Sequence, residues 1–178
     1  DREDSINYTA LHWAARNGLT ECCKLILGSD QAEHLITMRD ADSRTPLHFA
    51  VNGHLEIVKL LISTEKGLSC ITMQNHWGWT PLHRAAFHGH SKVVTILLQT
   101  KQGFDALAIK NKKGTGKTPL DLATERNNTK TISIIKEALA PPIDLTIIPW
   151  DVSIQDIQIE EELYCQISGQ IMNDPVEI

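Results

Sequence analysis

Residues 78–98 read GWTPLHRAAFHGHSKVVTILL, and the pattern in this stretch occurs four times along the chain. Its most regular part is a four-residue motif that reads TALH at 9–12, TPLH at 45–48, TPLH at 80–83 and TPLD at 118–121. The steps between successive threonines are 36, 35 and 38 residues. A period of this length indicates a stack of small structural units, each of which buries its apolar face against its neighbours.

Each unit has the residues expected of two short helices joined by a turn. Threonine can cap a helix by accepting a backbone N–H bond, and proline is tolerated in the first helical turn, where its missing N–H has no partner in any case. A residue that tolerates a positive φ then ends the first helix, and it is Gly18, Gly53, Gly89 or Asn127. A second apolar run follows in every unit: CCKLIL at 22–27, IVKLLI at 57–62, VVTILL at 93–98 and ISIIKEAL at 132–139.

The repeated residues resemble the ankyrin repeat, whose pattern G-x-T-P-L-H-x-A-A-x-x-G-H-x-x-V-V-x-x-L-L is followed closely at 78–98. The resemblance implies an all-α repeat fold, an ankyrin-repeat solenoid of four helix-pair repeats with hairpin fingers projecting to one side. It covers about residues 5–139, with repeats near 5–36, 40–71, 75–107 and 111–139.

The units are two to five residues longer than the ankyrin period of about 33 residues. Part of the excess lies between the second helix and the next finger, where ITMRD at 36–40, ITMQN at 71–75 and LAIKN at 107–111 align. We expect this added length to extend one edge of the stack.

Five of the eight histidines occupy repeated positions. For His12, His48 and His83, the fourth residue of the motif, the resemblance implies that the imidazole bonds to backbone and ties neighbouring fingers together. His54 and His90 follow the glycine that ends the first helix. Because no Cys/His spacing typical of zinc ligands accompanies them, we predict neither a metal site nor another cofactor. Residues 1–139 also show no set of nucleophile, base and orienting acid, so binding is predicted rather than catalysis.

A different class of function is suggested by NKKGTGKT at 111–118. Gly116, Lys117 and Thr118 fit the end of a phosphate-binding loop, but Asn111 stands where the first glycine of that motif belongs. Alignment of the repeats places Thr118 on Thr80, which predicts a helix cap and a two-residue insertion in the finger tip. A nucleotide-binding protein that uses Lys117 is therefore kept only as a remote alternative.

Composition narrows the class of partner. The net charge is −5 and the pI is about 5.9, which argues against a nucleic-acid binder. No apolar run is long enough to span a bilayer, and the four cysteines form no disulfide-dense or metal-binding pattern. These features favour the cytoplasm, with the nucleus, or the host-cell cytoplasm for a bacterial effector, also open.

The residues expected to contact a protein partner are those that the repeat does not need for folding. Trp77 and Trp79 flank Gly78 at the tip of the third finger, where a large aromatic side chain is a common interface anchor; packing against adjacent fingers is the alternative. The others are predicted to occupy unconstrained positions of the first helices: Trp13, Arg16, Arg44, Arg84, Phe87 and His88.

The C-terminal part has a different character. Pro141 and Pro142 cannot continue a helix, so residues 140–159 are predicted to form an extended linker. Residues 164–176, YCQISGQIMNDPV, resemble the opening of a U-box, the zinc-free relative of the RING domain, with Gln166 in place of the usual proline. The resemblance implies that Ile167 contacts a ubiquitin-conjugating enzyme. Only the start of such a domain, about residues 160–178, is present; a chance turn built on Asp174 and Pro175 is the alternative.

Two main hypotheses follow. In the first, the repeats are the substrate-recruiting part of a U-box ubiquitin ligase, and the ligase activity belongs to a longer parent protein rather than to this fragment. In the second, the chain is a non-catalytic ankyrin scaffold or adaptor. Both place a protein partner on the concave face and finger tips. Fold alone does not identify that partner.

Overall fold

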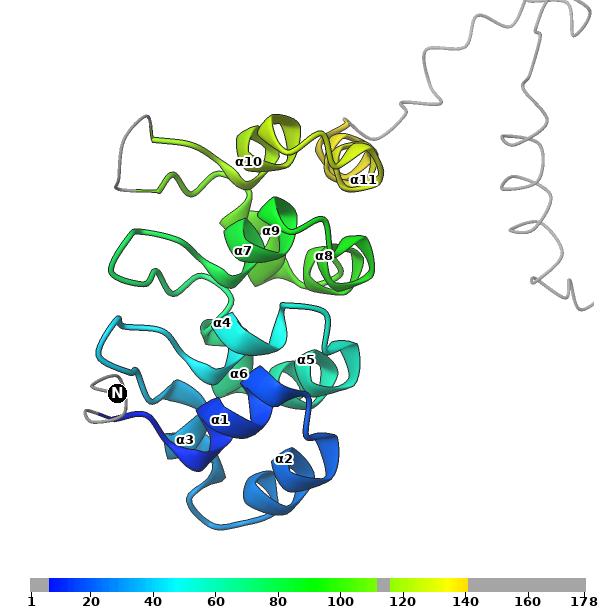
Figure 1. Cartoon of the computed structure of the whole chain (residues 1–178). Coiled ribbons are helices and arrows are strands. Elements are labelled where there is room, and N and C mark those ends of the chain that lie inside the picture. The colour runs from blue at the N-terminus through cyan, green and yellow to red at the C-terminus, as the bar shows by residue number, and fades with distance from the viewer. Residues whose placement is uncertain (1–6, 112–115, 141–178) are drawn as a thin grey trace, which may run out of the picture. The chain divides into compact units, whose positions relative to one another are not determined.

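A computed structural model describes residues 7–111 and 116–140 of the chain (Figure 1). Residues up to Ala140 belong to one compact unit. The predicted linker and the U-box-like segment lie outside the described residues, as does the tip of the fourth finger at 112–115.

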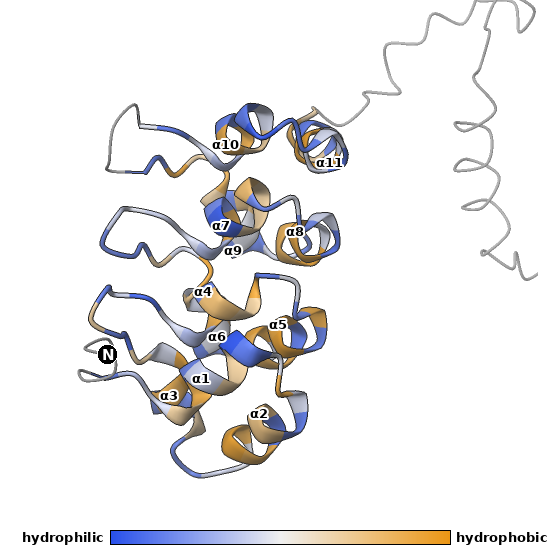
Figure 2. Cartoon of the chain, in the orientation of Figure 1, coloured by the Kyte–Doolittle hydropathy of each residue, from blue (hydrophilic) through white to orange (hydrophobic). Residues whose placement is uncertain are grey.

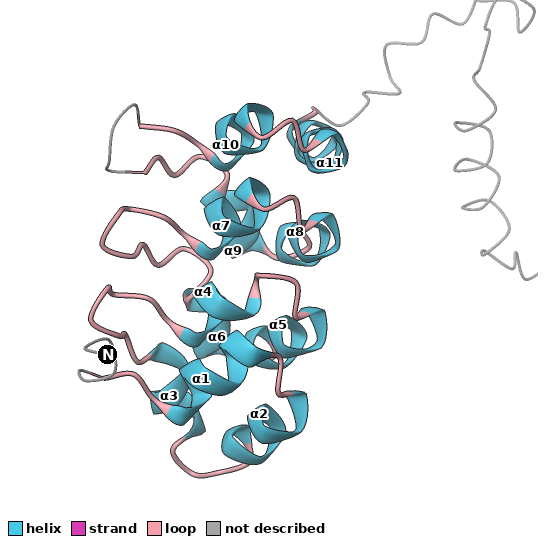
Figure 3. Cartoon of the chain, in the orientation of Figure 1, coloured by secondary structure: helices cyan, strands magenta, loops and turns pink. Residues whose placement is uncertain are grey.

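The described part of the chain contains helices and loops but no strand (Figure 3). Four first helices follow one another along the stack: α1 (Ala10–Asn17), α4 (Pro46–Ala50), α7 (Pro81–Phe87) and α10 (Pro119–Glu125). Each is followed by a second helix: α2 (Thr20–Leu27), α5 (Leu55–Ile62), α8 (Ser91–Leu98) and α11 (Thr129–Leu139). The predicted all-α repeat fold is thereby confirmed.

Each first helix begins at the predicted threonine because that residue completes a reciprocal cap. In the third repeat the Thr80 hydroxyl accepts from the backbone N–H of His83 at 3.3 Å, and His83 Nδ1 accepts from the Thr80 N–H at 3.2 Å. The same exchange is present at Thr9 and Thr118. Two backbone N–H groups that a helix leaves without internal partners are thereby satisfied.

The turn between the paired helices requires a left-handed residue. Gly18 and Gly89 both have φ of 72°, and Asn127 takes the same place in the fourth repeat with φ of 54°. Glycine pays no steric penalty there, and asparagine tolerates the conformation better than most residues. The prediction that a residue tolerant of positive φ ends the first helix is confirmed.

The core is continuous through all four repeats, because each apolar helix face is covered by the next repeat. α1 packs on α4, and α7 packs on α10. Leu11, Leu47 and Leu82 are equivalent residues of the first helices and are fully buried. Figure 2 shows the same division, with hydrophobic residues concentrated on the helices and hydrophilic residues along the fingers.

Three repeats contain a third short helix that the sequence did not predict: α3 (Ala32–Thr37), α6 (Glu65–Ser69) and α9 (Lys101–Ala106). Thr64 caps α6 by accepting from the Gly67 N–H at 3.1 Å, and Thr100 caps α9 by accepting from the Gly103 N–H at 3.0 Å. The extra residues of these long repeats therefore form a helix rather than only a longer approach to the finger.

Each finger is a loop closed by a buried Asp or Asn. The Asp40 N–H donates to the Arg44 carbonyl at 2.9 Å, and the equivalent bond joins Asn75 to Trp79 at 2.9 Å. The Asn75 Oδ1 also accepts from the N–H of Trp79 at 3.0 Å, and Asn111 Oδ1 accepts from the N–H of Lys117 at 2.9 Å. These side-chain bonds fix the turn of the finger without a strand ladder.

Candidate protein-binding surface

The motif histidines hold each finger in place. His12 Nε2 lies 3.0 Å from the Arg44 carbonyl oxygen, His48 Nε2 lies 3.0 Å from that of Trp79, and His83 Nε2 lies 3.1 Å from that of Lys117. A carbonyl only accepts, so Nε2 carries the proton, and Nδ1 is free to accept from the threonine N–H. The resemblance-based prediction that these rings tie neighbouring repeats is confirmed.

Burial keeps these rings neutral. It lowers the pKa of His48 to about 3 and that of His83 to about 4, although the carbonyl bond of each ring opposes the shift. The pKa of His12 is lowered for the same reason. A second proton on Nδ1 would also face the threonine N–H, which donates to Nδ1 in the neutral ring.

The residues of the surface next to the fingers can be identified by their position within each repeat. When the motif threonine is counted as the first residue, the fifth residues are Trp13, Phe49, Arg84 and Leu122, and the eighth are Arg16, Asn52, Phe87 and Glu125. The residue just before the threonine is the inner end of the finger, and it is Tyr8, Arg44, Trp79 or Lys117. We call the face formed by these side chains, together with Arg126, the inner face.

The first cluster of the inner face is built on Phe49. Its ring is 2 % exposed, and the guanidinium carbons of Arg44 and Arg84 lie 4.8 Å and 5.9 Å from its centroid. Arg84 Nε donates to Asn52 Oδ1 at 2.8 Å, which joins the second and third repeats. Burial, with the charges of Arg44 and Arg16, lowers the pKa of Arg84. Cations thus gather over one aromatic ring.

Arg44 differs from Arg84 because it already has carboxylate partners. Its Nε lies 2.7 Å from Asp40 Oδ2, and another guanidinium nitrogen lies 3.0 Å from Asp42 Oδ2. Both carboxylates belong to its own finger. Arg44 therefore stabilises the second finger as well as covering Phe49.

The second cluster is built on Phe87. Trp79 contacts it edge-on with ring centroids 5.1 Å apart, and the guanidinium carbon of Arg126 lies 4.0 Å from the centroid. His88 contacts the same ring at 5.1 Å. Both Trp79 and Phe87 remain partly exposed. This cluster presents an aromatic and cationic surface that runs from the third finger to the fourth repeat.

The remaining predicted contact residues lie apart from these clusters. Trp77 packs edge-on against His76 at 5.9 Å, at the finger tip. Trp13 is 55 % exposed on α1, and Arg16 is exposed one turn later. The structure therefore brings Arg44, Arg84, Trp79, Phe87 and His88 into two clusters, whereas Trp77 belongs to a separate contact.

Sequence reasoning missed Phe49, Asn52 and Arg126. The first two share repeat positions with predicted residues, so the register of the repeats could have identified them. Arg126 reaches Phe87 across the boundary between two repeats, and no single repeat contains a signal for that contact.

The described residues of the NKKGTGKT stretch, Asn111 and 116–118, form the base of a finger and a helix cap. The Thr118 hydroxyl donates to Asp121 Oδ2 at 2.7 Å, and the ammonium group of Lys117 pairs with Glu125. The helix that follows, α10, has seven residues. Thr118 is a helix cap, as predicted, and its hydroxyl is directed at a carboxylate.

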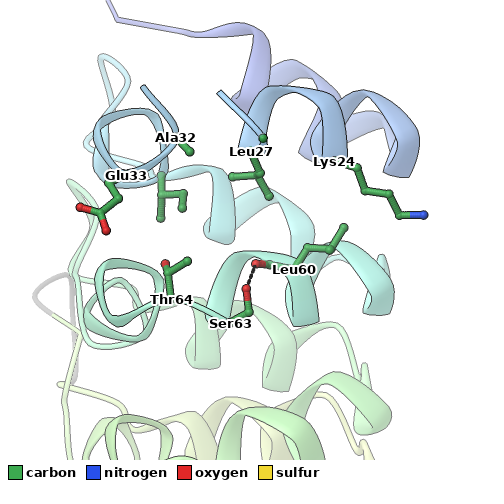
Figure 4. Close-up of a pocket in the computed structure, with 9 residues that line it drawn as sticks. Lys24, Leu27, Ala32, Glu33, Leu60, Ser63 and Thr64 are labelled. Atoms are coloured by element: carbon green, nitrogen blue, oxygen red, sulfur yellow. Dashed lines mark hydrogen bonds between the residues drawn. The ribbon is translucent and has the colours of Figure 1, made fainter. Parts of the chain in front are cut away.

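A separate hollow of about 300 Å³ lies between α2, α3 and α5 (Figure 4). Leu27, Ile36 and Leu60 line it, with Lys24 and Glu33 on opposite sides. Ser63 Oγ donates to the Leu60 carbonyl at 2.8 Å. Its lining is mainly aliphatic, which offers packing space rather than reactive groups.

Among residues 7–111 and 116–140, no group of three or more His, Cys, Asp or Glu side chains is placed to hold a metal ion. In the same part of the chain, no helix combines the length and apolar character needed to cross a membrane.

Comparison with known families agrees with the fold. Residues 1–70 match a family model described as ankyrin repeats (3 copies), and residues 50–98 match one described as ankyrin repeats (many copies). A search of curated proteins finds no match.

Proposed function

Because the chain is an ankyrin-repeat protein, a fold that binds protein partners, we propose that its inner face is the surface that binds one. The observation that carries the proposal is the cluster around Phe87. Phe87 contacts Trp79 of its own repeat and Arg126 of the next repeat, and all three side chains remain accessible; aromatic and arginine side chains dominate binding energy at protein interfaces.

Rigidity supports the same proposal. The buried histidine bonds fix each finger relative to the first helix of the preceding repeat. The partner therefore meets side chains that are already ordered, and less conformational entropy is lost on binding.

A direct test is affinity capture from cells with the full-length parent protein. We expect the double variant Trp79→Ala/Phe87→Ala to lose partners that the wild type retains. Lys92→Met, an exposed change on α8, is the matched control and should retain them. Partners that survive the double variant but depend on the α8 side would overturn the assignment of the inner face.

We further propose that the repeats recruit substrates for a U-box ubiquitin ligase. Support comes from the sequence YCQISGQIMNDPV at 164–176, which follows the U-box opening in order apart from Gln166. Bringing a target to a module that positions a charged conjugating enzyme raises the effective concentration of the target lysine.

The ligase proposal is tested with the parent protein extended beyond residue 178 and purified activating and conjugating enzymes. Ubiquitin chains should form with the wild type and be lost in Ile167→Ala. If neither protein forms chains with a broad panel of conjugating enzymes, the non-catalytic scaffold is the better description.

A further inference from the structure

The charge of the chain is divided unevenly, which bears on the kind of partner that the inner face accepts. All 17 Lys and Arg residues lie within residues 1–140, together with 14 of the 22 Asp and Glu residues. The repeat part is therefore weakly basic although the whole chain is acidic. The net charge of the repeat part is therefore opposite in sign to that of an acidic partner segment.

The arginines of the inner face differ in whether a carboxylate already neutralises them. Arg44 has Asp40 and Asp42, both within salt-bridge distance. Arg16, Arg84 and Arg126 form no salt bridge within residues 7–111 and 116–140. Three guanidinium groups, two on first helices and one directly after α10, thus remain without a carboxylate partner in the described part of the molecule.

Arg84 is the most constrained of the three. Its Nε is occupied by Asn52, and its guanidinium lies over Phe49, so its position is set before a partner arrives. Its partial burial lowers its pKa, and the neighbouring charges of Arg44 and Arg16 act in the same direction. A carboxylate bound there would relieve that repulsion and could accept two parallel N–H bonds.

We propose that the inner face binds an acidic peptide segment of a protein partner, whose carboxylates pair with Arg84, Arg16 and Arg126 while its apolar side chains contact Trp79 and Phe87. This inference rests on the proposed function and specifies the chemistry of the partner. The repeat part is only weakly basic, which favours a peptide with mixed acidic and apolar residues over a nucleic acid, whose binding depends on many Lys and Arg contacts to phosphate.

The proposal is tested on the full chain by fluorescence anisotropy at low salt. The probe is a labelled peptide of about 12 residues in which Glu alternates with Leu, long enough to cross several repeats when extended. Its counterpart with Gln in place of Glu reports the contribution of charge, and a labelled single-stranded RNA of similar length reports nucleic-acid binding.

We expect the Glu peptide to bind at least about tenfold more tightly than the Gln peptide, and Arg84→Met to weaken it by about tenfold or more. Methionine retains the aliphatic contact with Phe49 but removes the charge. Lys92→Met removes the same charge from α8 and should leave affinity within about twofold. Arg16→Met, at an exposed position, supplies the same test if Arg84→Met fails to fold by circular dichroism.

Equal losses in Arg84→Met and Lys92→Met would overturn the proposal, because they indicate nonspecific attraction. Tighter binding of the RNA would overturn it in favour of a nucleic-acid surface. Absence of Glu-peptide binding would also overturn it. In that case the protein-binding function still stands if Trp79→Ala/Phe87→Ala loses its cellular partners, and fails too if they are retained.

Discussion

The first three repeats carry histidine at the fourth motif position, whereas the fourth carries Asp121. Both side chains close the cap locally: His83 Nδ1 accepts from its threonine N–H at 3.2 Å, and Asp121 Oδ2 does so at 2.8 Å. The second ring nitrogen of His83 also reaches the next finger, at the Lys117 carbonyl, whereas Asp121 belongs to the last repeat that the structure describes. Capping a helix and joining two repeats are therefore separable tasks.

The environments of the two residues differ as well. His48 and His83 are fully buried, whereas Asp121 is exposed. Hydrogen bonds from Thr118 lower the pKa of Asp121, while burial lowers the pKa of the histidines. The fourth motif residue is thus an ionised carboxylate in the last repeat and a neutral imidazole in the others.

The largest expected consequence concerns pH. Unfolded histidine takes up a proton below its ordinary pKa of 6.5, but folded His48 and His83 stay neutral until about pH 3 and 4. The unfolded state therefore binds more protons between these limits, and stability falls as pH is lowered from 6.5. We expect a loss of about 2 kcal/mol for each ring between pH 7 and pH 5, or about 4 kcal/mol together.

Urea denaturation at a series of pH values measures this dependence. The double variant His48→Gln/His83→Gln is the control, and its unfolding free energy should change much less between pH 7 and pH 5. A slope that is unchanged in the variant would show that other groups, such as the exposed His88 and the partly buried His90, control acid stability.

The next prediction compares the loss of His48 with the loss of Asp121, which occupy the same motif position. His48→Ala leaves the buried Thr45 N–H without its acceptor and removes the bond to the Trp79 carbonyl. With the cavity left by the ring, we expect a loss of about 3 kcal/mol in the free energy of unfolding. Asp121→Ala removes an exposed cap that water can replace, and should cost about 1 kcal/mol.

Chemical denaturation of both variants at pH 7 gives this comparison. Equal losses would mean that the link between repeats adds little to the local cap. A second readout is amide hydrogen exchange in the third finger, which should accelerate in His48→Ala and remain unchanged in Asp121→Ala.

A smaller effect concerns the third helix, which the first three repeats contain. A Cβ placed on Gly67 would lie 1.6 Å from the Leu61 carbonyl oxygen. Gly67→Ala is therefore expected to cost about 2 kcal/mol, although alanine ordinarily favours a helix. Gly28→Ala is the matched control, because its Cβ would meet only ordinary contacts at 3.5 Å. Thermal unfolding should separate the two, and similar midpoints would show that α6 shifts freely.

The third helix also marks the limit of what the sequence could predict about the fold. The helix pairs follow from threonine caps, left-handed glycines and apolar runs, all of which are local signals. The T-x-x-G stretches at 64–67 and 100–103 repeat too, but glycine inside a helix normally argues against it. Glycine is needed at position 67 because the Leu61 backbone approaches closely, and that contact exists only after the repeats fold.

On the inner face, too, some features follow from position within the repeat and others only from packing. Position within the repeat predicts which first-helix residues share a face, and it would have included Phe49. It cannot distinguish Trp77 from Trp79, which flank the same glycine. Gly78 turns the chain with φ of 77°, and only Trp79 then contacts Phe87.

The smallest predicted effect is that of Lys117→Met. The ion pair of Lys117 with Glu125 is partly exposed, and such pairs contribute little, so we expect a change of less than about 0.5 kcal/mol in the free energy of unfolding.

Thermal unfolding of both proteins with and without a nucleoside triphosphate and magnesium tests the remote nucleotide-binding alternative at the same time. A ligand at a hundred times its dissociation constant would stabilise the wild type by about 2.7 kcal/mol, a shift well above the effect of the substitution. Stabilisation of the wild type that disappears in Lys117→Met would favour a phosphate site at 111–118. No shift in either protein is the result expected of a finger whose lysine pairs with Glu125 and whose Thr118 hydroxyl bonds to Asp121.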